Sequence, residues 1–162
     1  MNERIMIVED EALIALSLKD NLESHGYNIC GIYDNGEIVL NNLEEKKPDL
    51  ILMDINIKGV WNGIETAEKI KKLYDVPLLF LTSYNTEYIL KKARKVSPYG
   101  YIEKTINDKD IHLAIDRILI THNKKIPDKI KVEINEIEDN VKIFSLISKR
   151  SNHPILYINN TA

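Results

Sequence analysis

The sequence predicts an α/β fold in which helices cover both faces of a parallel sheet. Short aliphatic runs recur along the chain, and each is followed by a segment whose apolar residues have helical spacing. The central run, residues 50–53, is apolar throughout, as is typical of a strand that is buried on both faces. Five strands alternating with five helices imply a parallel sheet with right-handed crossover connections.

The strands are expected at residues 4–8, 27–33, 50–53, 77–81 and 101–103, and the helices at residues 12–24, 37–46, 64–74, 85–96 and 106–122. Turn signals such as Asn35-Gly36 separate these elements. We expect the apolar residues of each helix to pack on the sheet. In the first, second and fifth helices these residues are Leu13, Leu16, Leu18 and Leu22, then Ile38, Val39, Leu40 and Leu43, then Ile111, Leu113, Ile115, Ile118 and Leu119.

The composition, with 44% hydrophobic and 29% charged residues, is that of a soluble globular protein. With 22 Lys+Arg against 25 Asp+Glu, the chain lacks the basic excess of a nucleic-acid-binding surface, so we expect no nucleic-acid partner. A single cysteine, Cys30, provides neither a disulfide framework nor a cysteine-based zinc site. No apolar run approaches the length of a membrane span and no secretory signal precedes the first strand, so we expect a cytoplasmic protein without membrane contact.

The ends of the expected strands carry residues that suit phosphoryl chemistry. The first strand is followed by Glu9 and Asp10, the third by Asp54, the fourth by Thr82 and the fifth by Lys104. One acid after a strand is more often a turn residue, but the carboxyl ends of parallel strands meet at one ligand-binding edge. Three crowded carboxylates favour a divalent cation such as Mg²⁺, and a hydroxyl and a lysine suit phosphoryl oxygens. The set therefore predicts an aspartate that accepts a phosphoryl group.

Four segments that contain these residues resemble a response-regulator receiver domain of two-component signalling. They are Val8-Glu9-Asp10-Glu11, Leu52-Met53-Asp54-Ile55, Leu81-Thr82-Ser83 and Gly100-Tyr101-Ile102-Glu103-Lys104. Their order and spacing match the family over about residues 3–122. The resemblance implies a flavodoxin-like, doubly wound (βα)5 fold with a five-stranded parallel sheet in the order 2-1-3-4-5.

The resemblance also implies the roles of the acidic residues. Asp54 would be the phospho-acceptor and would contribute to a Mg²⁺ site. Asp10 would bind the ion directly, Glu9 would bind it through water, and the backbone carbonyl of Asn56 would be a further ligand.

Three further residues have roles by the same resemblance. Thr82 would bond a phosphoryl oxygen and report phosphorylation, and Lys104 would pair with the phosphoryl group or with unmodified Asp54. Tyr101 matches the aromatic switch position, whose ring turns inward when Thr82 moves. Each residue also has a simpler explanation: Thr82 as a helix cap, Lys104 as a solvated turn charge and Tyr101 as sheet packing.

The sequence departs from the family pattern at Thr105, where the family usually has a proline preceded by a cis peptide bond. A cis bond without proline costs about 3–4 kcal/mol. We therefore expect a trans Lys104–Thr105 bond and a displaced Lys104.

Residues 123–162 lie outside the five-fold alternation, so we expect a receiver domain at residues 1–122, a linker at 123–129 and a C-terminal extension at 130–162. The extension is expected to begin as a helix, since its apolar residues follow the spacing of a coiled-coil seam, although residues 130–134 also alternate like a strand. Residues 153–160 resemble the opening strand of a PAS sensor domain, which suggests that the chain is the front part of a longer PAS-containing sensor or kinase. The seam residues are Ile130, Ile134, Ile137, Val141 and Phe144.

The expected function is a Mg²⁺-dependent phosphorylation switch rather than a free-standing enzyme. Its partner would be a histidine kinase or a phosphotransfer protein, and a homodimer could form through the fourth helix, fifth strand and fifth helix or through the C-terminal helix. Two alternatives remain: a single-domain regulator that docks on a partner, and a receiver-fold scaffold that is never phosphorylated.

Overall fold

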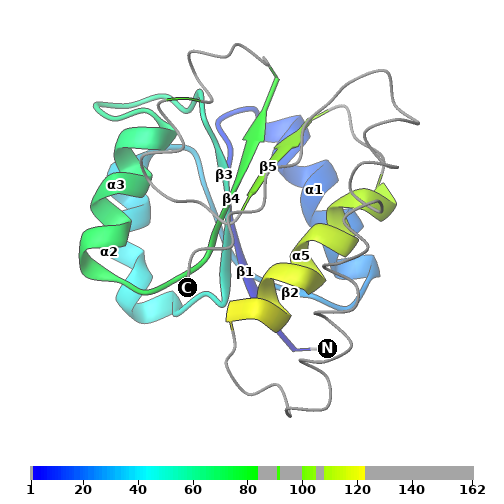
Figure 1. Cartoon of the computed structure of the whole chain (residues 1–162). Coiled ribbons are helices and arrows are strands. Elements are labelled where there is room, and N and C mark those ends of the chain that lie inside the picture. The colour runs from blue at the N-terminus through cyan, green and yellow to red at the C-terminus, as the bar shows by residue number, and fades with distance from the viewer. Residues whose placement is uncertain (1, 84–90, 92–99, 105–107, 123–162) are drawn as a thin grey trace.

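The computed structural model describes residues 2–83, 91, 100–104 and 108–122. Within them, one parallel sheet has the strand order β2-β1-β3-β4-β5, which confirms the predicted fold class and order (Figure 1). The strands are β1 (Arg4–Val8), β2 (Asn28–Tyr33), β3 (Leu50–Asp54), β4 (Leu78–Thr82) and β5 (Gly100–Glu103). The helices are α1 (Ala12–Ser24), α2 (Gly36–Lys46), α3 (Gly63–Leu73) and α5 (Asp108–His122).

The sheet is the middle of three layers, with α2 and α3 on one face and α1 and α5 on the other (Figure 1). The strands alternate between the two faces, because successive side chains of a strand point in opposite directions. Met6 and Ile51 belong to the core beneath α2 and α3, whereas Ile5 and Leu52 belong to the core beneath α1 and α5. Every residue of β3 and β4 is buried, so the aliphatic runs of these strands are explained by double coverage.

The predicted helix faces are partly wrong. Leu13 is 84% exposed and Leu16 is 52% exposed, whereas Ala15 and Leu22 of the same helix are buried. At 100° per residue Leu13 lies about 160° around the helix axis from Ala15, so the two cannot face the sheet together. Ile38 in α2 and Leu113 in α5 are exposed for the same reason, since they lie off the stripes that the buried residues of their helices form.

Side-chain caps fix the starts of α2 and α3 beside the carboxyl edge of the sheet. Asn35 accepts a hydrogen bond from the backbone N–H of Ile38, and Asn62 and Glu65 form a reciprocal capping box. The caps therefore fix the residues at which α2 and α3 begin, after the loops that follow β2 and β3. Of the helices that the structure describes, none has the length and hydrophobicity needed to cross a bilayer.

Several predictions from the sequence fall outside the described residues. They concern the helix at residues 85–96, the Lys104–Thr105 peptide bond, the linker and the C-terminal extension, including the seam and the resemblance to PAS.

The buried Tyr27 joins the start of β2 to α5. Its hydroxyl donates a hydrogen bond to the Asp116 carboxylate, and the residue is only 4% exposed. Burial raises the pKa of Tyr27 far above its ordinary value of 10.0, and the hydrogen bond to Asp116 raises it further. In the folded protein, the phenol therefore keeps its proton at a pH where the unfolded chain would lose it.

We expect Tyr27→Phe to weaken the dependence of the free energy of unfolding on pH at alkaline pH. Above about pH 10 the folded state binds one more proton than the unfolded state at this residue, so the free energy of unfolding falls as pH rises. The slope should be shallower by about 1.4 kcal/mol per pH unit in the variant. Urea unfolding from pH 8 upward checks this, with Tyr74→Phe as the control. Parallel slopes for wild type and Tyr27→Phe would contradict the assignment.

Candidate functional site

Three carboxylates converge at the carboxyl ends of β1 and β3. Val8 pairs with Met53 across these strands, so the residues that follow, Glu9 and Asp54, emerge next to each other. Single carboxylate oxygens from Glu9, Asp10 and Asp54 all lie within 4.8 Å of one another. Glu9 and Asp54 are each only 2% exposed. The structure therefore brings together all three acids that the sequence predicted to share this edge.

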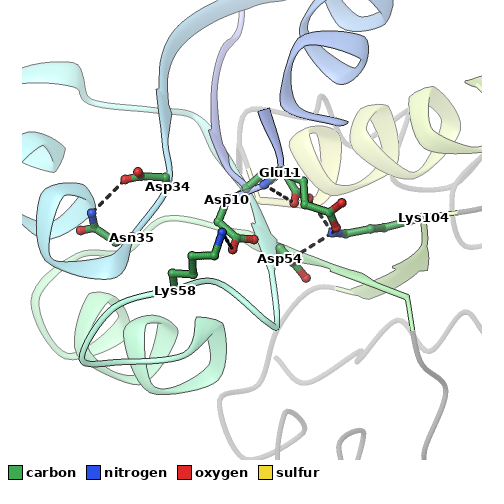
Figure 2. A network of polar contacts seen from close by, with 8 residues as sticks. Asp10, Glu11, Asp34, Asn35, Asp54, Lys58 and Lys104 are labelled. Atoms are coloured by element: carbon green, nitrogen blue, oxygen red, sulfur yellow. Dashed lines mark hydrogen bonds and ion pairs between the residues drawn. The ribbon is translucent and has the colours of Figure 1, made fainter. Parts of the chain in front are cut away.

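Lys104 lies between two of these acids. Its Nζ is 2.7 Å from Oε2 of Glu9 and 2.9 Å from Oδ2 of Asp54, and its side chain is 10% exposed. Figure 2 shows the lysine reaching across from the end of β5 to Asp54. The predicted displacement of Lys104 is wrong, because its backbone N–H donates to the carbonyl of Thr82 at 3.0 Å and so holds it at the end of the sheet.

Burial sets the electrostatics of the cluster. It raises the pKa of Glu9; the hydrogen bond from Lys104 acts in the opposite direction, and the nearby charge of Asp54 adds to the increase. For Lys104, burial acts to lower the pKa, but the hydrogen bonds to Glu9 and Asp54 outweigh it, and the pKa is raised. The cluster thus holds Lys104 as a cation and favours additional positive charge.

Both oxygens of the Asp54 carboxylate have partners. Oδ1 accepts from the backbone N–H of Asn56 at 3.1 Å, and Oδ2 accepts from Lys104. The backbone of the next residue is also fixed, since the N–H of Ile55 donates to the carbonyl of Leu81 and the carbonyl of Ile55 accepts from the N–H of Gly63. The carboxylate is therefore held in one orientation at the edge of the sheet.

We expect Gly63→Ala to destabilise the fold and disturb Asp54. A Cβ at this position would lie 2.0 Å from the backbone oxygen of Asp54 and 2.9 Å from Cα of Ile55, so β3 and α3 would have to separate. The expected loss is about 1–3 kcal/mol of the free energy of unfolding. Urea unfolding measures the loss, and the NMR shift of the Asp54 amide reports the local disturbance.

Gly36→Ala is the control for that prediction. Its Cβ would meet the side chain of Thr66 instead, 2.1 Å from Oγ1, and so should destabilise the fold without moving Asp54. A stable Gly63→Ala protein with an unchanged Asp54 amide would show that the packing of α3 on β3 is looser than described.

Thr82 and Tyr101 lie on the neighbouring strands β4 and β5. Both are buried, and Thr82 is paired with Glu103 across the two strands. The ring of Tyr101 already lies inside the protein, stacked on Phe80 with 5.9 Å between ring centroids and 17° between planes. This geometry agrees with a packing role for Tyr101 on the sheet. The ring also has the inward position that the resemblance assigns to the switched state.

Lys58, in the loop between β3 and α3, was not predicted as a site residue. Its Nζ lies 3.2 Å from Oδ2 of Asp10, and its side chain is 81% exposed (Figure 2). The sequence offered one signal, an isolated lysine four residues after Asp54. Trp61 in the same loop is half-buried, and the Nζ of Lys69 in α3 lies 4.2 Å from its ring centroid, so the ring packs against the adjacent helix.

Comparison with known proteins identifies the family. The family model of the response regulator receiver domain matches residues 5–116. The chain belongs to this family. Receivers are signalling domains of two-component systems, generally without enzymatic activity of their own, and they interact with histidine kinases or phosphotransfer proteins. They generally bind Mg²⁺ at an acidic pocket, and this receiver has such a cluster.

Individual relatives resemble this receiver over part of their length. Transcriptional regulatory protein YdfI of Bacillus subtilis is 27% identical over 136 residues, which are 83% of this chain and 63% of YdfI. Transcriptional regulatory protein PdtaR of Mycobacterium tuberculosis is 32% identical over 113 residues, which are 70% of this chain and 55% of PdtaR. The chain thus spans less than two thirds of either relative.

A solved structure shares the fold at a similar level of identity. It is the signal receiver domain of a modulated diguanylate cyclase from Desulfovibrio desulfuricans G20, with 31% identity and a TM-score of 0.73. The match covers 78% of this chain and all of that domain.

Proposed function

We propose that this receiver is a phosphorylation switch in which Asp54 accepts a phosphoryl group in a Mg²⁺-dependent reaction. The main support is that Glu9, Asp10 and Lys104 all lie next to Asp54. An aspartate that accepts a phosphoryl group needs neighbours that compensate its negative charges, and a buried lysine at 2.9 Å provides one of them. The remaining acids provide oxygen ligands for the divalent cation.

The donor set fits Mg²⁺. This ion prefers carboxylate, carbonyl and water oxygens, and it is usually bound by a few carboxylates together with water and phosphate oxygens. Asp10, Asp54 and the backbone carbonyl of Asn56 would hold it, with Glu9 contributing through water. When bound, the ion neutralises the charge that builds up on the phosphoryl oxygens.

Asp54 acts as the nucleophile in the proposed transfer. One of its carboxylate oxygens forms a bond to phosphorus while the phosphorus–nitrogen bond of a donor phosphohistidine breaks, and the histidine nitrogen leaves with that electron pair. With acetyl phosphate as donor, the phosphorus–oxygen bond breaks and acetate leaves. The product in both cases is an aspartyl phosphate. Lys104 then pairs with the phosphoryl oxygens, as a positive group suited to them.

The signal would leave the site through β4 and β5. Thr82, at the carboxyl end of β4, would bond a phosphoryl oxygen. Tyr101, on the neighbouring strand, would be held in its inward position once Thr82 has moved, and so fix the shape of the face around β5 and α5. We propose that this face contacts a partner protein, a histidine kinase or phosphotransfer protein being the donor, and that it or the C-terminal extension supports a homodimer.

A docking regulator that uses no phosphate and an unphosphorylated scaffold are the competing functions. Neither needs a buried acid cluster, which costs stability when no cation neutralises it. A cytoplasmic location, the absence of a nucleic-acid partner, the receiver boundary at residue 122 and continuation into a PAS domain stay predictions.

Incubation with acetyl phosphate tests the proposal. In Mg²⁺, intact-mass spectrometry should show the gain of one phosphoryl group, and excess chelator should prevent the gain. An unchanged mass under both conditions, in protein shown to be folded, would favour the docking regulator or scaffold.

A further inference from the structure

The acid cluster is in contact with two lysines that are held in different ways. Lys104 is nearly buried and bridges Glu9 and Asp54. Lys58 comes from the opposite side, touches only Asp10 among the described acids at 3.2 Å, and leaves most of its side chain in solvent. Asp10 itself is 11% exposed, so its charge is poorly hydrated and gains from this contact.

The backbone that carries Lys58 is clamped to the start of α2. Lys58 forms an isolated parallel β-bridge with Asn35, and two residues later the N–H of Val60 donates to Oε1 of Glu37 at 2.9 Å. Between them Gly59 has φ +118°, and a Cβ there would lie 2.9 Å from Oε2 of Glu37. These contacts fix the path of the loop and therefore the position of the Lys58 Cα atom.

The backbone of Lys58 is fixed, whereas its ammonium group is in solvent and free to move within the reach of the side chain. Its ammonium can leave Asp10 at low cost to itself, because the Lys58 side chain is mostly in solvent and stays hydrated when the contact breaks. Lys104 cannot do so without leaving two buried carboxylates unpaired. The cluster thus has one fixed cation, Lys104, and one displaceable cation, Lys58. The displaceable cation contacts Asp10, which belongs to the same three-acid cluster as the partners of Lys104.

We infer that Lys58 competes with the divalent cation for Asp10 and thereby lowers the affinity of this receiver for Mg²⁺. The inference rests on the metal site of the proposed function. When the ion binds, Lys58 must release Asp10, and its positive charge remains near the ion. Both effects weaken metal binding, and both disappear if the residue has no charge.

Lys58→Ala should therefore bind the metal more tightly, by about twofold to fivefold. The full 162-residue chain is titrated with Mn²⁺, which also takes oxygen ligands, and free Mn²⁺ is followed by electron paramagnetic resonance. Competition with Mg²⁺ then gives the affinity for that ion. The difference between variant and wild type should shrink at high ionic strength, because exposed charges are screened.

Matched variants separate the local effect from a change of net charge. Lys58→Arg keeps the charge and should bind the metal like wild type. Lys72→Ala removes one positive charge from an exposed position in the last turn of α3 and should also bind like wild type.

Two results would overturn the inference. Equal or weaker metal binding by Lys58→Ala, with binding lost in Asp10→Asn, would leave the metal site intact and remove the role of Lys58. No Mn²⁺ or Mg²⁺ binding by any folded form would overturn the metal site together with the inference.

Discussion

Replacing Asp54 with asparagine is expected to abolish phosphoryl incorporation from acetyl phosphate completely. The amide has nearly the shape of the carboxylate and can still accept the hydrogen bond from Asn56, so the fold should persist. It lacks the anionic oxygen that attacks phosphorus. It also removes one of the three oxygen ligands that the acid cluster offers to a metal. Intact-mass spectrometry of the variant in Mg²⁺ checks the prediction.

Asp34→Asn is the matched control, because it makes the same substitution at the carboxyl end of β2. Asp34 is exposed, hydrogen-bonds Asn35 and lies away from the cluster in Figure 2. This variant should gain one phosphoryl group, which is also the result expected for wild type. A phosphoryl gain in Asp54→Asn equal to that of Asp34→Asn would assign the acceptor to another residue.

Lys104→Met is expected to have the largest effect on stability. The substitution leaves Glu9 and Asp54 facing each other, both buried, without the cation that contacts them. Removing one partner from a buried ion pair costs about 3–5 kcal/mol, because the remaining charge is uncompensated. Urea unfolding in metal-free buffer measures the loss, with Lys72→Met as the control at an exposed site.

Mg²⁺ and a second substitution identify the cause of that loss. Added Mg²⁺ should restore part of the stability of Lys104→Met, since a ligand that binds only the folded state stabilises it. Combining Lys104→Met with Asp54→Asn should cost less than the sum of the two single changes, because the unpaired charge is removed. Strict additivity would mean that the ion pair does not account for the loss.

The strands and the acid cluster could be predicted because both follow from local sequence and from topology alone. An aliphatic run followed by an acid, repeated in β1 and β3, places Asp10 and Asp54 at one edge whatever the side-chain packing. The same holds for Lys104, whose position is set by the end of β5 and by its backbone hydrogen bond to Thr82. The expectation that Thr105 would displace it gave too much weight to one neighbouring residue.

What could not be predicted depends on contacts between distant segments. The stripe of α1 that faces the sheet is decided by packing, and it excludes Leu13 although the residue is apolar. Lys58 reaches Asp10 because its loop is bonded to Asn35 and Glu37, and a lysine four residues after Asp54 does not by itself predict that contact. Tyr27 and Asp116 are far apart in sequence and meet only when α5 packs beside β2.

A crystal structure with Mg²⁺ and beryllofluoride, which stands in for the phosphoryl group, would show directly whether Asp54 is the phospho-acceptor. We expect beryllium bonded to a carboxylate oxygen of Asp54, and Mg²⁺ in contact with Asp10 and Asp54. We also expect the Lys104 ammonium to contact a fluoride and Lys58 to have released Asp10. An unmodified Asp54 that still pairs with Lys104, in crystals grown with both reagents, would contradict the assignment of this site as a phospho-acceptor.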